Sequence, residues 1–226
     1  MLVFTKGSVE GVTVIDEILQ KFYLVSGLQC NPSKSEIFSA GVTEQLKGEL
    51  VRHSGFREGE LPVRYLGLPL NAGKLTAEDC KSLISRITWR ILGWQPKLLS
   101  YAGKLEFVVS VLSSMSQYWM NVILLPNKVI KEIENLCSQF LWSDFEKKKR
   151  AKFAWKTVAL PRTEGGMGFK DLHSWNKACL ARHFWGILSD QDTLWIAWLN
   201  EYRLRDHSIW EVQTMGSWVW NKILKI

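Results

Sequence analysis

A cluster of basic and aromatic side chains offers the clearest chemistry in this sequence. Its cations lie within a few residues of aromatic rings, so the cations could meet phosphates while the rings meet bases or riboses. A solvated basic loop with aromatic neighbours packed in the core is an equally good interpretation. The cations are Lys147, Lys148, Lys149, Arg150, Lys152 and Lys156, and the aromatic residues are Phe145, Phe153 and Trp155.

The acidic residues do not indicate a catalytic centre. Nucleotidyl transfer needs clustered carboxylates that hold two metal ions, and no acidic pair here sits at a strand end with a converging partner. Asp16 and Glu17 are expected on the solvated face of a helix, and Glu78 and Asp79 in the first turn of another. The other pairs are Glu58 with Glu60, Asp144 with Glu146, and Asp190 with Asp192. The sequence therefore predicts neither catalytic residues nor a metal site.

Nucleophilic and zinc chemistry find no better support. The sequence contains no GxSxG or HExxH motif. Cys179 and His183 are four residues apart and would share a helix face, but two further zinc ligands are missing, so a buried thiol beside an imidazole is expected. The run Gly165 to Gly168 lacks the Gly-Lys-Ser/Thr ending of a phosphate-binding loop, and we expect a tight turn there.

Charge and composition favour a polyanionic partner. The net charge is +7. Between Arg86 and Arg162 there are thirteen Lys/Arg and five Asp/Glu, which leaves the rest of the chain close to neutral.

The four cysteines form no CxxC pair, which favours free thiols in a reducing compartment. No signal peptide is visible, and the apolar run 107–125 contains too many polar residues for a membrane span.

The order of elements predicts an α+β fold in which helices dominate. Residues 1–5 and 34–39 are expected to form short strands, 11–26 and 43–53 helices, and 61–70 an edge hairpin. Further helices are expected over 76–92, 100–124, 126–140, 171–188 and 192–202, with a basic loop at 146–150 and a turn-rich segment at 162–170. Most of the twelve Trp residues have apolar neighbours and are expected in the core or at an interface.

Several motifs, taken in order, resemble plant LINE-type (non-LTR) retrotransposon reverse transcriptases, over about residues 26–185. The first is SGLQCNPSKS, which resembles the segment after the palm helix, and the second is RYLGLPL, which resembles the primer grip. The later matches cover the family's thumb helices and its glycine-rich connector. They are Ser100 to Leu105, Ser110 to Leu112, Pro126 with Phe140 to Trp142, Pro161 with Glu164 to Leu172, and Asn176 to Ala178.

This resemblance implies a fragment of an RNA-directed DNA polymerase that uses magnesium and acts inside the cell, in the nucleus. In the family an aromatic-Ala-Asp-Asp turn precedes the segment equivalent to residues 1–4, so the catalytic aspartates are expected to be missing from this chain. We therefore expect no cofactor in this chain, weak binding of an RNA or DNA primer–template, no membrane association, and a complementing polymerase fragment as a further partner.

The resemblance also implies a domain order. Residues 1–75 correspond to a partial palm that carries the primer-grip-like element. Residues 76–145 correspond to thumb-like helices. Residues 146–226 correspond to the basic loop, the glycine-rich turn and a truncated helical connector. A chain without the rest of the palm would leave apolar surface exposed around Ile15, Leu19 and Phe22.

Candidate nucleic-acid-binding residues follow from the matching positions. Lys34 matches a lysine that can lie near the triphosphate, although a plain surface lysine is an equally good interpretation. Tyr65, Leu66 and Gly67 would form the primer-grip turn, or else a strand edge packed on the palm, and Gly67 would allow close backbone approach. The remaining candidates are Lys97 and Lys104 on the thumb helices, where ordinary surface lysines are also expected, and Lys147, Lys148, Lys149, Arg150 and Lys152 in the basic loop.

A different function remains open at this point. The Trp-rich helices could form a protein-interaction module that has no nucleic-acid role. The two functions differ in what they require of the basic loop, because only the polymerase fragment needs its cations for RNA binding.

Overall fold

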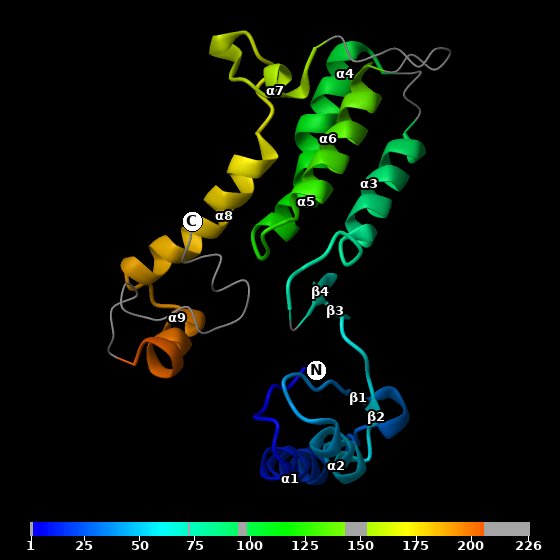
Figure 1. The fold of residues 1–226 in the computed structure, drawn as a ribbon, viewed down its shortest axis with the longest axis vertical. Coiled ribbons are helices and arrows are strands. Elements are labelled where there is room, and N and C mark those ends of the chain that lie inside the picture. The colour runs from blue at the N-terminus through cyan, green and yellow to red at the C-terminus, as the bar shows by residue number, and fades with distance from the viewer. Residues whose placement is uncertain (1, 72, 95–98, 143–152, 206–226) are drawn as a thin grey trace. The chain divides into compact units, whose positions relative to one another are not determined.

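The computed structural model describes residues 2–71, 73–94, 99–142 and 153–205, and they form two compact units, residues 1–72 and 73–226. Helices dominate both units and the strands are few and short, so the predicted α+β fold is confirmed. Figure 1 shows the elements with their labels. The naming of these parts as palm, thumb and connector stays a prediction.

The first unit is built on two capped helices. Helix α1 (Val9–Ser26) begins where the Ser8 hydroxyl accepts the N–H of Gly11, and α2 (Glu44–Ser54) begins at Thr43 in the same way. Both end at a glycine in the left-handed conformation, which the absent Cβ permits. The helices pack together, and a 2.9 Å hydrogen bond joins Thr13 Oγ1 to His53 Nε2.

The strands of this unit form two small ladders. The 3-10 turn η1 (Pro32–Lys34) leads into β1 (Glu36–Ile37), which pairs in parallel with β2 (Arg57–Glu58). β3 (Val63–Tyr65) and β4 (Leu68–Leu70) pair antiparallel, as the expected hairpin requires. The strand expected over residues 1–5 is wrong: residues 2–5 are not a strand, because no described strand offers them hydrogen-bond partners.

The face of α1 that was expected to be uncovered is indeed largely open. Of this helix only Val12 is buried, while Phe22 is 54% exposed and Ile15 and Leu19 are half-buried. An apolar stripe of this kind on an otherwise regular helix marks surface that another element normally covers.

The second unit is a helical assembly. A long helix is composed of α4 (Tyr101–Glu106), the π-helical turn η3 (Phe107–Leu112) and α5 (Ser113–Met120), and it packs beside α3 (Lys81–Gly93) and α6 (Asn127–Trp142) (Figure 1). The Phe107 ring lies between those of Trp94 and Phe140, with centroids 4.7 and 5.1 Å away. Helix α3 begins at Lys81, later than expected, because the N–H groups of Cys80 and Lys81 donate to the carbonyls of Ala77 and Glu78, three residues back, so residues 77–80 form turns and not α-helix.

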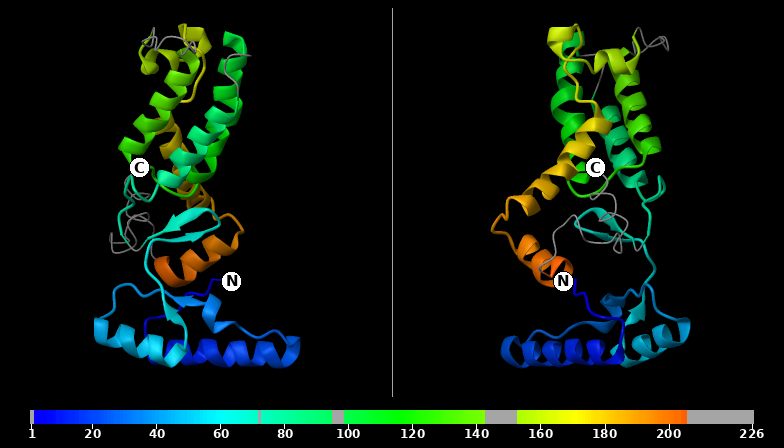
Figure 2. Two further views of the ribbon diagram at one scale, coloured as in Figure 1. Left: turned by 90° about the vertical axis from the view of Figure 1, so that its right-hand side faces the viewer. Right: turned by 60° about the vertical axis from the view of Figure 1, so that its left-hand side comes forward.

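The segment 153–171, which contains the glycine-rich turn and is called the glycine-rich connector below, returns the chain to this assembly. It contains α7 (Trp155–Val158) and the 3-10 turn η4 (Arg162–Glu164), and it leads into α8 (Leu172–Leu188), which packs on α5 and α6. Beyond it come α9 (Leu194–Leu199) and the π-helical turn η5 (Asn200–Leu204), drawn in orange in Figure 2. Ile196, Leu199 and Leu204 of these elements form a small apolar cluster with Ile187. Within the described ranges, no helix combines the length and apolarity that crossing a bilayer requires.

Asn176 fixes α8 to the turn between α5 and α6. Its side chain is fully buried, and its Nδ2 donates to the carbonyl oxygens of Met120 and Ile123, each 2.9 Å away. Its Oδ1 accepts the backbone N–H of Leu125 at 2.8 Å. One amide group therefore serves three backbone groups of a turn that would otherwise be buried without partners.

Replacing Asn176 by Ala is expected to lower the free energy of unfolding by about 3 kcal/mol, because three buried backbone groups lose their partner. Urea unfolding followed by circular dichroism measures this. Lys177→Ala, on the exposed side of the same helix, serves as the control and should change stability by less than about 0.5 kcal/mol. A loss below about 1 kcal/mol for Asn176→Ala would contradict the bridging role.

Candidate nucleic-acid interface

The hairpin tip is the first candidate surface. Leu66 and Gly67 connect β3 to β4 as a two-residue turn with φ values of 50° and 82°, the signs of a type I′ turn, which suits the twist of a hairpin. Glycine at the second position costs no strain, whereas the left-handed conformation of Leu66 does. Tyr65 and Leu66 are 42% and 73% exposed, so the tip presents an aromatic ring and an aliphatic side chain to solvent.

Lys34 lies on a separate exposed turn of the first unit. It ends η1, where Asn31 caps the turn by accepting the backbone N–H of Ser33 at 2.9 Å. The guanidinium of Arg57 donates to the backbone oxygen of Ser33, which ties this turn to β2. Lys34 is therefore an exposed cation on a hydrogen-bonded turn, and its role near a nucleotide stays a prediction.

The other predicted cations have different positions. Lys104 is buried in α4, so its ammonium is not presented on an open helix surface as a backbone-contacting lysine would be. Lys97, Lys147, Lys148, Lys149, Arg150 and Lys152 lie outside the described residues. The interface built from the described chain thus rests on residues other than the basic loop.

The glycine-rich connector forms the tight turn that was expected, and it positions Lys170. Gly166 donates to the carbonyl of Pro161, and a Cβ at Gly166 would lie 2.0 Å from the oxygen of Leu160, so only glycine fits. The N–H groups of Met167 and Gly168 donate to the carbonyls of Val158 and Leu160, each at 3.0 Å. These hydrogen bonds hold the segment 166–168 against the end of α7 and the residues that follow it. Phe169 and Lys170 come next in the chain.

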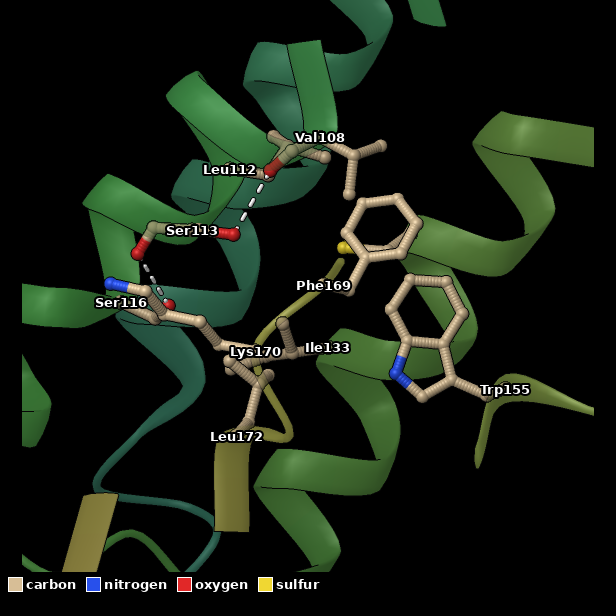
Figure 3. Close-up of a pocket in the computed structure, with 10 residues that line it drawn as sticks. Val108, Leu112, Ser113, Ser116, Ile133, Trp155, Phe169, Lys170 and Leu172 are labelled. Carbon is tan, nitrogen blue, oxygen red and sulfur yellow. Dashed lines mark hydrogen bonds between the residues drawn. The ribbon is translucent and has the colours of Figure 1, made fainter. Parts of the chain in front are cut away.

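Phe169 and Lys170 point to different sides of this segment. Phe169 is buried and stacks on the Trp155 ring at a centroid distance of 5.1 Å. Figure 3 shows that the Lys170 side chain instead extends away from Trp155, along Ser113 and Ser116 of α5. Its ammonium lies 3.5 Å from the centre of the Trp175 ring, a cation–π contact that holds the cation in place.

Trp175 is itself fixed by a network between α5 and α8. Its indole Nε1 donates to Gln117 Oε1, while Gln117 Nε2 donates to Asn121 Oδ1 at 2.9 Å and to Cys179 Sγ at 3.1 Å. His183 Nε2 bonds the backbone oxygen of Asn121 at 2.7 Å. Cys179 and His183 therefore share a structural network, as expected, and no group of three His, Cys, Asp or Glu side chains in the described residues could hold a metal.

Burial and hydrogen bonds shift the pKa of Asp171 at the start of α8 and those of two side chains on the neighbouring α6. Burial alone would raise the pKa of Asp171, but hydrogen bonds from the Ser174 hydroxyl and backbone N–H lower it below its ordinary value. Burial raises the pKa of Glu134, and the neighbouring carboxylate of Asp171 adds to this. Burial also raises the pKa of Cys137 to about 12, so this thiol is protonated at neutral pH and unreactive.

This part of the surface contains none of the site residues predicted from the sequence. The run 165–168 was expected to be a turn, and neither Lys170 nor the serines of the long helix were among the candidates. A usable signal was present, because Lys170 follows directly on a turn that needs its glycines and lies five residues before an aromatic residue. Whether Lys170 reaches that ring depends on the helix start at Asp171, which is not encoded in composition.

Two relatives among known proteins agree with a plant retrotransposon-related origin. The chain is 33% identical over 163 residues to the "Putative ribonuclease H protein At1g65750" of Arabidopsis thaliana, covering 69% of this chain and 26% of that protein. It is 29% identical over 111 residues to the "Uncharacterized mitochondrial protein AtMg00310" of the same plant, covering 47% of this chain and 72% of that protein. Relatives of this kind are typical of retrotransposon-derived sequences. No family model matches the chain.

Replacing Asp171, the N-cap of α8, by Ala should destabilise the protein by about 1 kcal/mol at pH 7. Because the folded-state pKa is lowered, the carboxylate stabilises above the unfolded-state pKa of about 3.9, and this stabilisation is lost as the pH falls through the folded-state value. Urea unfolding at several pH values should show the difference between the wild type and Asp171→Ala shrinking below about pH 4. A difference independent of pH would show that the charge is not involved.

Proposed function

We propose that this chain is a segment of a plant non-LTR retrotransposon reverse transcriptase that grips nucleic acid without polymerising it alone. The observation that carries the proposal is the RYLGLPL segment, which folds as a hairpin with Tyr65 and Leu66 exposed at a tight tip. This is the form in which a primer-grip element would meet a strand end, because the turn allows close backbone approach at Gly67. The similarity to retrotransposon-related plant sequences supports the same origin.

The acidic residues indicate why we separate nucleotidyl transfer from primer–template binding in this proposal. Polymerisation requires carboxylates that hold two magnesium ions a few ångströms apart. Within the part of the chain that the structure describes, no three potential ligands converge, so these residues do not fit the magnesium site of the intact family. We assign nucleotidyl transfer to palm elements outside this segment, and gripping of the primer–template to this segment.

The open face of α1 fits the same proposal. Val14, Ile18 and Phe22 recur at helical spacing and are each more than half exposed. We expect the remaining palm, supplied as a complementing polymerase fragment, to cover this stripe, because burying the exposed half of each side chain is favourable by about 1 kcal/mol.

The alternative function is a protein-interaction module, and one observation favours it. The rings of Trp198 and Tyr202 stack with centroids 5.8 Å apart and are 50% and 61% exposed, and Trp185 is 65% exposed. Exposed aromatic residues of this kind are enriched at protein interfaces. Such a module would not need the cations of the basic loop.

Removing the positive charges of residues 147–150 distinguishes nucleic-acid binding from the protein-interaction module. The quadruple variant Lys147→Gln, Lys148→Gln, Lys149→Gln and Arg150→Gln should weaken RNA binding about tenfold or more and flatten its salt dependence, because counterion release is lost with each phosphate contact. Fluorescence anisotropy with a labelled RNA at several salt concentrations measures both effects.

The matched control removes the same charge elsewhere, with Lys6, Lys21, Lys81 and Lys128 each changed to Gln. All four are exposed. Equal losses in the two variants would indicate a general charge effect. RNA affinity unaffected by the loop variant, or wild-type binding that does not weaken with salt, would favour the interaction module.

A second prediction concerns catalysis. The purified chain should extend no primer on an RNA or DNA template with magnesium and deoxynucleoside triphosphates, as followed on a sequencing gel. An intact reverse transcriptase with the same substrates is the positive control. Deoxynucleotide incorporation that copurifies with the chain and scales with its concentration would contradict the proposal that this chain does not polymerise alone.

A further inference from the structure

We infer that a groove between the long helix and the glycine-rich connector binds a ribose-phosphate unit of an RNA strand. The inference rests on the proposed function and adds a site whose lysine and serines are not among the nucleic-acid-binding residues predicted from the sequence. The groove has a volume of about 270 Å³ and lies within the second unit. Its lining residues are Val109, Ser110, Ser113, Ser114, Gln117, Gly168, Phe169 and Lys170.

The charge of the groove selects for an anion. Lys170 is the charged residue of its lining, and no carboxylate is among the described residues that line it. The contact with Trp175 holds the ammonium 3.5 Å from the ring centre while the side chain stays exposed. Arg162 is outside the lining, but its Nε lies 3.5 Å from where a Cβ on Gly168, a lining residue, would be. Both an ammonium and a guanidinium bind phosphate.

The polar side chains of the groove act mainly as acceptors. Ser110 Oγ donates to the carbonyl of Glu106 at 2.7 Å, and Ser114 Oγ donates to that of Val111 at 2.8 Å. A hydroxyl that has given its proton to the backbone keeps lone pairs that can accept. Gln117 has no donor left for a ligand, since its Nε2 donates to Asn121 and Cys179, and its Oε1 already accepts from Trp175. The exposed oxygens of Ser110 and Ser114 are therefore free to accept from a ligand donor.

A ribonucleotide strand matches both features. Its phosphate supplies the anion for Lys170, and its 2′-hydroxyl supplies a donor for the serine oxygens. A DNA strand has the phosphate but lacks this donor. The π-helical turn η3 also positions a serine of the groove lining. Its wider winding lets Ser113 Oγ donate to the carbonyl of Val108, five residues back, at 3.0 Å. Turns of this type are frequent at functional sites.

The test compares a labelled RNA with DNA of the same sequence by fluorescence anisotropy, using the full chain. The wild type should prefer RNA about fivefold, the equivalent of one net hydrogen bond. The double variant Ser110→Ala and Ser114→Ala should lose this preference while keeping its DNA affinity. Lys170→Met, which keeps the side-chain stem over Trp175, should weaken RNA and DNA about equally, by about threefold or more, and flatten the salt dependence.

Matched controls lie on exposed helix positions outside the groove. They are Ser85→Ala on α3 and Lys177→Met on α8, and both should behave as the wild type. A second readout is acetylation of lysines followed by mass spectrometry, in which RNA should protect Lys170 but not Lys177. Protection of Lys170 by inorganic phosphate as strong as by RNA would show a free-anion site and overturn the strand proposal.

The outcomes separate this inference from the proposed function. RNA binding by the wild type with no effect of the groove variants overturns the groove and leaves the proposed function intact. Equal affinity of the wild type for RNA and DNA overturns the role of the ribose. Absence of any nucleic-acid binding by the wild type overturns both.

Discussion

The second unit depends on a single buried amide. Asn176 closes the turn between α5 and α6 with three hydrogen bonds and thereby fixes where α8 begins its contact with both helices. An apolar side chain could fill the same space, but it would leave the turn's backbone groups without partners in a dry interior, which is costly. Because α8 is placed by this amide, the segment immediately before it, with Phe169 and Lys170, is placed as well.

Much of the fold could be predicted because caps and periodicity act locally. Ser8, Thr43, Ser100 and Asp171 each cap a helix near the start that the sequence predicts, and glycine or proline marks several of the ends. The strand expected at residues 1–5 is wrong for a non-local reason. An apolar segment becomes a strand only when another strand supplies its hydrogen bonds, and no composition rule reports whether that partner exists.

The candidate site was harder to predict than the fold, and Lys104 shows why. It lies three and four residues before Phe107 and Val108, both buried, so it shares their helix face and its stem is covered. Its basic character suggested phosphate contact, but its position in the helix decided its burial. Lys170 is the opposite case, since it lies in a segment that looked purely structural and becomes available only because α8 and its network orient Trp175.

Nucleic-acid binding and nucleotidyl transfer differ in how many residues must converge at one point. Catalysis by paired metal ions needs several carboxylates within a few ångströms of one point, so removing one segment abolishes it. Contacts to a nucleic-acid backbone are distributed along a strand, and each cation contributes a roughly independent increment of counterion release. Under the proposed function, the hairpin tip, the ammonium of Lys170 and the basic excess between Arg86 and Arg162 would bind a strand without needing the catalytic carboxylates. The same reasoning explains why basic charge alone is a poor guide to specificity. Discrimination between RNA and DNA requires an acceptor at a defined place, and such places arise from packing between helices rather than from net charge.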